Sequence, residues 1–172
     1  MPLFSVVICT YNRSQRLRGA LDSVLRQDES DYELIVVDDG SEDDTAEVVA
    51  SFDSPLVRYV RRPNGGLSTA RNTGIKLAHG EFVIFLDDDD RVDPSWLSTL
   101  ASKIGPSTGV VSCGCRFYSP VTEWEMISLP QEQPAAFNSV TALFLAGTFA
   151  VRRQLYEQVG GYAEDLPISH QT

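Results

Sequence analysis

The stretch FVIFLDDDD, residues 82–90, decides the fold, because an apolar run of strand length ends abruptly in four consecutive aspartates. Four adjacent carboxylates repel one another and raise one another's pKa unless a cation lies among them. The nearest cation in the sequence is Arg91, the next residue. A hard divalent ion such as Mg²⁺ or Mn²⁺ prefers oxygen ligands and accounts for the cluster. The alternative is an acidic turn that is only solvated.

Predicted strands and helices alternate on both sides of this stretch. The predicted strands are residues 4–9, 33–37, 56–60 and 82–86, and the predicted helices begin at Ser14, at residues 41–44, after Gly65-Gly66 and at Asp93-Pro94. Residues 41–44 have the form of a capping box, and Gly80 and Gly105 are the expected ends of the third and fourth helices. This order predicts an α/β fold with a Rossmann-like, doubly wound, mainly parallel sheet and flanking helices.

Length and composition limit the class of protein. The chain has 172 residues, which suits one domain, and its formal net charge of −10 argues against a nucleic-acid surface. No apolar run reaches the roughly 18 residues of a membrane span, and the N-terminus lacks the basic start of a signal peptide, so we expect a cytoplasmic protein. Cys9, Cys113 and Cys115 form neither a disulfide framework nor a zinc pattern, and we expect them to be reduced.

All four predicted strands are followed by polar residues, and ligands of such sheets bind at the carboxyl ends of the strands. The segments concerned are residues 10–13, 38–41, 64–66 and 87–90. Gly65 and Gly66 open a helix, where backbone N–H groups are able to approach a phosphate, although turns use such pairs as well. Asp39 is predicted to accept a hydrogen bond from a ribose hydroxyl or a base N–H, with a cap or turn as the alternative.

Residues 6–13, 33–41, 65–74 and 86–90 together resemble the inverting glycosyltransferases of family 2, which have the GT-A fold. The resemblance implies that a nucleoside diphosphate sugar, preferably a UDP-sugar, is bound by Thr10, Tyr11, Asn12, Arg13, Asp39, Arg71 and Asp88. It also implies that Asp89 binds a divalent metal, Mn²⁺ or Mg²⁺, on the diphosphate. Four successive aspartates leave this register ambiguous by one, so Asp87 is a second metal candidate and Asp90 a further participant.

The resemblance further implies an acceptor hydroxyl, on a saccharide, a lipid-linked molecule or a protein, and a general base that takes its proton. In the family the base follows a Gly-Gly-aromatic turn, here residues 160–162, and where relatives often have Glu-Asp this chain has His170-Gln171. We therefore expect residues 1–105 to be the nucleotide-sugar half and residues 106–172 a partial, truncated acceptor half, with His170 as the base candidate inside the chain. Trp124 is a candidate for stacking on a sugar ring or for the core.

A lipid-linked acceptor would place the protein at the inner face of the membrane. Two other classes of function stay open at this point. A nucleotidyltransferase shares the acidic metal ligands but calls for a Gly-rich basic loop after the first strand, where residues 10–12 read Thr-Tyr-Asn. A nucleotide-binding module without turnover would keep the donor site and lack the base.

Overall fold

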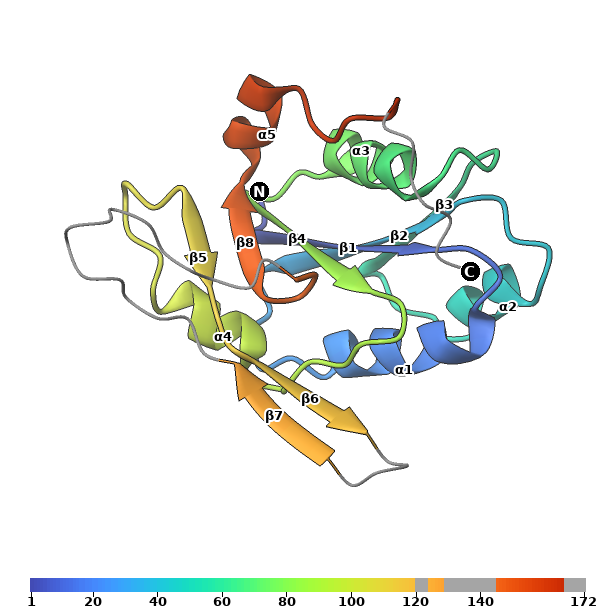
Figure 1. Ribbon diagram of the computed structural model, residues 1–172, viewed down its shortest axis with the longest axis horizontal. Helices are drawn as coiled ribbons and strands as arrows, with labels where there is room; N and C mark the ends of the chain where they lie inside the picture. The colour runs from blue at the N-terminus through green and yellow to red at the C-terminus, as the bar shows by residue number, and fades with distance from the viewer. Residues whose placement is uncertain (120–123, 129–144, 166–172) are drawn as a thin grey trace.

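A computed structural model of the chain describes residues 1–119, 124–128 and 145–165. Its main sheet has six strands in the order β3-β2-β1-β4-β8-β5 (Figure 1). The strands of this sheet are β1 (Phe4–Thr10), β2 (Tyr32–Asp38), β3 (Val57–Arg61), β4 (Phe82–Asp87), β5 (Val110–Ser112) and β8 (Phe149–Arg152). The first four are mutually parallel, whereas β8 runs antiparallel to both β4 and β5. The predicted mainly parallel α/β sheet is thereby confirmed.

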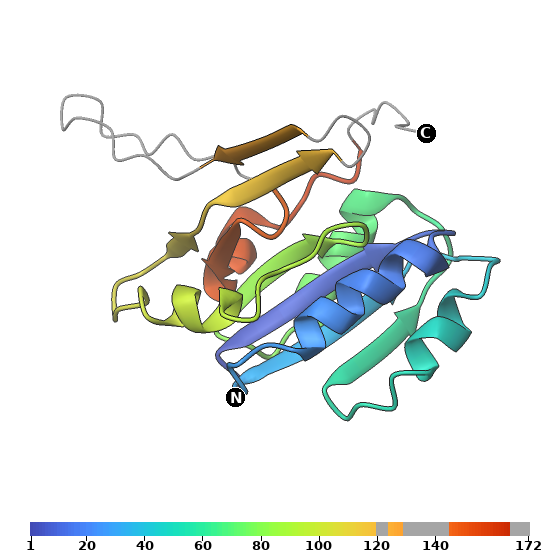
Figure 2. The same cartoon turned by 90° about the horizontal axis from the view of Figure 1, so that it is seen from below.

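Helices cover both faces of the sheet, as the doubly wound prediction requires (Figures 1 and 2). The helices are α1 (Ser14–Leu25), α2 (Thr45–Ala50), α3 (Leu67–Leu77), α4 (Trp96–Ala101) and α5 (Arg153–Val159). The α1 side packs on alternate residues of β1, such as Val6 and Ile8, and Leu17 and Leu21 of α1 are fully buried there. The α3 side packs on the intervening residue Val7. This alternation along one strand buries both faces of β1.

Three local predictions are wrong in detail. The capping box at residues 41–44 does not form: α2 begins at Thr45, and its N-cap Asp44 makes no side-chain capping bond. Helix α3 ends at Leu77, three residues before Gly80, and α4 ends at Ala101, four before Gly105. At Gly80 the reason is tertiary, because this glycine lies against the backbone of β1, where an added Cβ would be 2.5 Å from the Ser5 nitrogen.

The second half of the chain adds two strands to the main sheet and forms a separate pair of strands. Strand β8 pairs with β4 and carries β5 at the edge, while β6 (Cys115–Ser119) and β7 (Trp124–Ser128) form a separate antiparallel pair. Among the described residues no helix has both the length and the apolar character needed to cross a membrane.

Candidate functional site at the carboxyl ends of the strands

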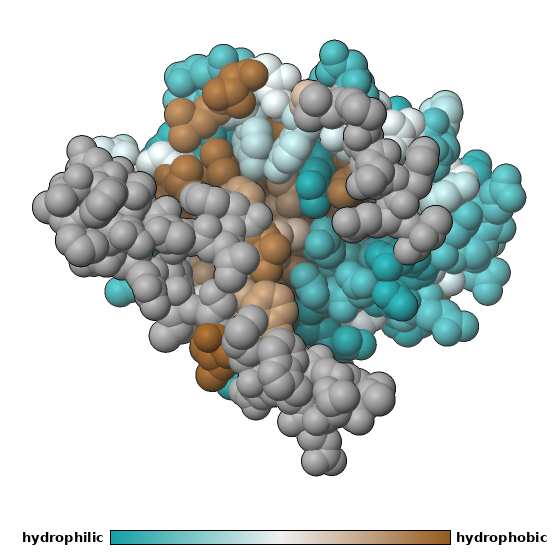
Figure 3. Space-filling model, viewed as in Figure 1, coloured by the Kyte–Doolittle hydropathy of each residue, from teal (hydrophilic) through white to brown (hydrophobic). Residues whose placement is uncertain are grey.

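The register of the sheet brings the acidic run beside the end of β1. Cys9 is paired with Asp87, so the next residues along the two strands, Thr10 and Asp88, meet where the strands end. The Thr10 hydroxyl donates to Asp88 Oδ2 at 2.7 Å, and Asp88 is only 3% exposed. Burial raises the pKa of Asp88 despite that hydrogen bond and the nearby Arg13. The surface over this edge is hydrophilic, whereas hydrophobic residues gather around β8 and α5 (Figure 3).

Two arginines from the start of α1, Arg13 and Arg16, form ion pairs with the acidic run. Arg13 Nη1 lies 2.8 Å from Asp88 Oδ1 and its Nη2 lies 3.3 Å from Asp89 Oδ2. Arg16 Nη1 lies 2.9 Å from the same Asp89 oxygen. Arg91, the nearest cation in the sequence, lies against Gly19 of α1. The side chains reach the run because α1 starts four residues after β1 ends.

Asp87 faces a third arginine, on the opposite layer. Arg71 Nη2 of α3 lies 3.4 Å from Asp87 Oδ1, and its guanidinium lies over the rings of Phe85 and Tyr162 at 5.7 and 5.4 Å from their centroids. A planar guanidinium suits both contacts, because it stacks on aromatic faces while its edge donates to a carboxylate. Arg71 thus reaches the strand ends from α3.

The acidic run suits a divalent ion by its chemistry. The side chains of Asp87 and Asp89 are 49% and 38% exposed, so both have oxygens open to a ligand. Partial burial and the negative charges of Asp87, Asp89 and Asp88 raise the pKa of Asp90 to about 6, although its side chain still meets solvent. Within the described ranges no three His, Cys, Asp or Glu side chains lie close enough together to hold a metal ion by themselves. Mg²⁺ commonly takes one or two carboxylates plus phosphate oxygens, and this donor set fits that pattern.

Asp39 holds the glycine loop, a role that the sequence does not predict. Its carboxylate accepts from the backbone N–H groups of Gly65, at 3.2 Å, and Gly66, at 2.7 Å, and it forms an ion pair with Arg62. Both N–H groups are therefore already bonded to Asp39, and a phosphate at this helix start has to replace that carboxylate. A base N–H that donates to Asp39 has to share or replace one of these partners.

Asn12 joins the two loops that follow β1 and β2. It has a positive φ of 53°, its N–H donates to Ser41 Oγ at 2.9 Å, and its Oδ1 accepts from the Glu42 N–H at 2.7 Å. Asn tolerates this left-handed conformation better than most residues. Tyr11, by contrast, is 47% exposed at the same edge. The structure thus gives Asn12 a bracing role and leaves Tyr11 accessible to a ligand.

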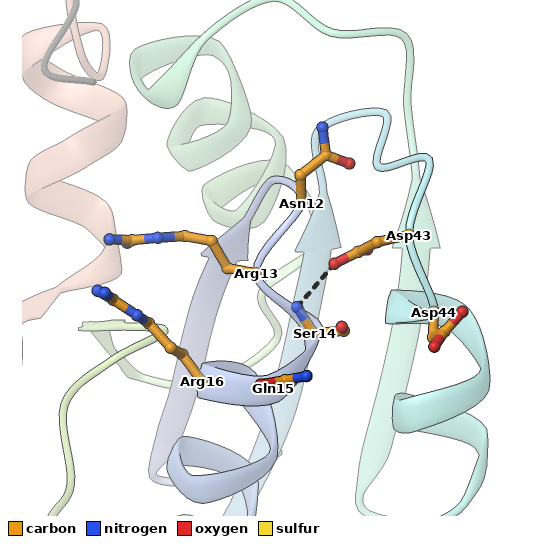
Figure 4. Close-up of a pocket in the computed structure, with 7 residues that line it drawn as sticks. All are labelled: Asn12, Arg13, Ser14, Gln15, Arg16, Asp43 and Asp44. Atoms are coloured by element: carbon orange, nitrogen blue, oxygen red, sulfur yellow. Dashed lines mark hydrogen bonds between the residues drawn. The ribbon is translucent and has the colours of Figure 1, made fainter.

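A polar pocket of about 570 Å³ lies beside these loops (Figure 4). Its lining residues are Asn12, Arg13, Ser14, Gln15, Arg16, Asp43 and Asp44. Asp43 accepts from the Ser14 N–H at 2.9 Å and so satisfies the start of α1. The arginines of the pocket point away from Asp43 and toward the acidic run (Figure 4).

The remaining candidates lie elsewhere or outside the described residues. His170 and the side chain of Trp124 fall outside the described part, so their roles stay predictions. All three cysteines are free, as expected, and burial raises the pKa of Cys9 to about 12. Sequence reasoning missed Arg16 and Arg62, because each pairs with an aspartate that is distant along the chain, by 73 and 23 residues.

Comparison with known proteins shows which proteins the chain is similar to. The model of the family "Glycosyl transferase family 2" matches residues 5–160. The chain is 29% identical to the uncharacterized glycosyltransferase EpsJ of Bacillus subtilis, over 98% of this chain and 55% of that protein. The structure of S. aureus TarS in complex with UDP-GlcNAc is similar with a TM-score of 0.70 and 26% identity, over 94% of this chain and 48% of that one.

A second solved structure also resembles the chain. It is the mannosyltransferase PcManGT of Pyrobaculum calidifontis in complex with GDP-Man and Mn²⁺, with a TM-score of 0.74 and 25% identity over 95% of this chain and 48% of that one. The chain thus spans about half the length of each of these three proteins.

Proposed function

Because the chain belongs to glycosyl transferase family 2, we propose that the whole protein transfers a sugar from a nucleoside diphosphate sugar to an acceptor hydroxyl. The observation that carries the proposal is the meeting of Thr10, Arg13 and the acidic run at one edge of the sheet. The solved relatives bind UDP-GlcNAc and GDP-Man, which supports a donor of this class. Family membership favours this activity over nucleotidyl transfer.

The donor's nucleoside lies, in this proposal, between Tyr11 and Asp39. Tyr11 is exposed beside the strand ends and offers a ring on which a base stacks. Asp39 recognises the polar edge of the base by exchanging one of its present partners. We favour UDP over GDP as the donor nucleotide. Arg71 and Asp88 complete the nucleotide site, from α3 and from the end of β4.

Asp89, with Asp87, would hold a Mn²⁺ or Mg²⁺ ion. When bound, such an ion stabilises the negative charge that develops on the leaving diphosphate. The residues of this chain orient the diphosphate and supply counter-charge: Arg13 and Arg16 already lie at Asp89. A relative crystallised with Mn²⁺ supports the metal.

Transfer with inversion needs a base for the acceptor's proton. We propose that this base follows the turn of residues 160–162, with His170 as the candidate inside this chain. The acceptor is a saccharide, a lipid-linked molecule or a protein, and a lipid-linked one would bring the enzyme to the inner membrane face.

Titration calorimetry tests the donor site directly. UDP is expected to bind in the presence of Mn²⁺, and EDTA is expected to abolish the binding, because bare diphosphate is repelled by a protein of charge −10. Asp89→Asn is expected to remove the metal dependence without unfolding the chain, since Asp89 is a partly exposed strand-end residue. A matched control is Asp31→Asn, at an exposed loop position before β2.

Two results would contradict the proposal. Equal UDP affinity with and without metal would refute the proposed role of the metal. Absence of binding of both UDP and GDP would refute the proposed donor site. Turnover is measured separately, as release of labelled sugar from UDP-sugars with and without acceptor sugars. Donor binding without any release would make the chain a nucleotide-binding module.

A further inference from the structure

Asn72, the residue after Arg71 on α3, forms hydrogen bonds through its side-chain amide with the turn that follows α5. Its Nδ2 donates to the Tyr162 carbonyl at 2.8 Å, and its Oδ1 accepts from the Tyr162 N–H at 2.8 Å. The same Nδ2 donates to Glu164 Oε1 at 2.7 Å. Asn72 is 8% exposed, so these bonds replace water and their loss leaves buried polar groups unsatisfied.

The turn itself is shaped to receive this amide. Gly160 and Gly161 both have positive φ, 83° and 82°, a conformation that favours glycine. A Cβ on Gly161 would lie only 2.5 Å from Asn72 Oδ1. Two glycines in succession therefore let the backbone of Tyr162 close on Asn72, although Tyr162 is 90 residues further along the chain.

The docked turn places an aromatic ring against Arg71. The Tyr162 ring packs edge-on against Phe85 at 5.5 Å and stacks with Tyr156 at 6.1 Å. Arg71 lies over both Tyr162 and Phe85, and its free edge reaches Asp87. The guanidinium thus packs between two aromatic walls: the Phe85 ring of β4, and the Tyr162 ring, which is in place only while the turn is docked on α3.

We propose that Asn72 is a positioning residue for the nucleotide site: by docking the turn it holds Tyr162 against Arg71 and so aims Arg71 at the acidic run. The inference rests on the proposed function, because it assumes that Arg71 contacts the nucleotide. It adds to the nucleotide site a residue that acts indirectly, because the Asn72 amide is hydrogen-bonded to the turn.

UDP affinity in the presence of Mn²⁺ tests the inference. Asn72→Ala is expected to weaken UDP binding about tenfold, which corresponds to about 1.4 kcal/mol. In an Arg71→Met background the same Asn72→Ala change is expected to leave UDP affinity unchanged, because no guanidinium remains to be aimed. It should still lower Tm in that background, since the hydrogen bonds to Tyr162 are lost either way. This non-additivity in binding separates positioning from a purely structural role.

The matched control is Thr73→Ala, on the same helix, whose hydroxyl bonds only the Thr69 carbonyl at 2.9 Å within the described structure. It is expected to leave UDP affinity unchanged. Should Asn72→Ala not fold, Tyr162→Leu removes the second wall alone and is expected to weaken UDP binding to a similar degree.

Three results would overturn the inference. The first is wild-type UDP affinity in Asn72→Ala. The second, if Asn72→Ala does not fold, is wild-type UDP affinity in Tyr162→Leu. The third is a loss of UDP affinity from Asn72→Ala that is the same in the wild-type and the Arg71→Met backgrounds. Absence of UDP and GDP binding in the wild-type chain would instead refute the proposed function.

Discussion

Arg16 is predicted to compete with the metal ion for Asp89. Its guanidinium lies 2.9 Å from Asp89 Oδ2, and the two side chains are 60% and 38% exposed. An ion pair this exposed contributes about 0 to 1 kcal/mol. Because a metal on Asp89 would displace Arg16, the pair stabilises only the metal-free protein. Removing it in Arg16→Gln should therefore strengthen Mn²⁺ binding by at most about fivefold.

The same reasoning predicts the effect of Arg16→Gln on the free energy of unfolding. Without metal, Arg16→Gln should lower the free energy of unfolding by the same amount, at most about 1 kcal/mol. At saturating Mn²⁺ the variant and the wild type should have nearly equal free energies of unfolding, because the pair is absent from both. Calorimetric titration with Mn²⁺ and urea denaturation with and without the ion measure the two effects.

Arg26→Gln is the matched control. Arg26 follows α1, pairs with Asp22 at 2.9 Å with side chains 70% and 48% exposed, and carries the same charge far from the acidic run. It should leave the Mn²⁺ affinity nearly unchanged. Weaker Mn²⁺ binding in Arg16→Gln would refute the reasoning, because it would mean that Arg16 supports the ion instead of competing with it.

Two further predictions concern stability. Gly74→Ala adds a Cβ 2.4 Å from Val7 Cγ1, so overpacking of about 1 to 3 kcal/mol should exceed the gain of about 1 kcal/mol in helix propensity, and urea denaturation should show a less stable protein. Burial raises the pKa of Glu33, but hydrogen bonds from Ser5 and His79 outweigh it, and the net pKa lies below 4.5. Since a lowered carboxyl pKa stabilises the fold only above that range, Glu33→Gln should cost about 1 to 2 kcal/mol at pH 7 and progressively less as the pH falls below 4.5 in chemical denaturation. An equal cost at pH 3 would contradict this.

Local patterns in the sequence determined the order of the elements. The apolar run of residues 82–86 and its alternation with amphipathic segments predicted the parallel sheet, because periodicity and strand length are properties of neighbouring residues. The polar strand ends predicted where a ligand site lies, since the carboxyl ends of parallel strands share one edge. The acidic run, Thr10 and Arg13 do meet at that edge.

The partners within that edge were decided only by the tertiary structure. Arg16 meets Asp89 across 73 residues, Asp39 binds the glycine loop across 26 and 27, and Asn72 meets Tyr162 across 90. Such pairs depend on the strand register and on how far each helix start stands from its strand end, and no local pattern encodes either distance. Helix ends shifted for the same reason: at Gly80 the close backbone of β1, and not the glycine's turn preference, sets the path of the chain. Packing across layers therefore determined which polar groups face a ligand and which are already bound.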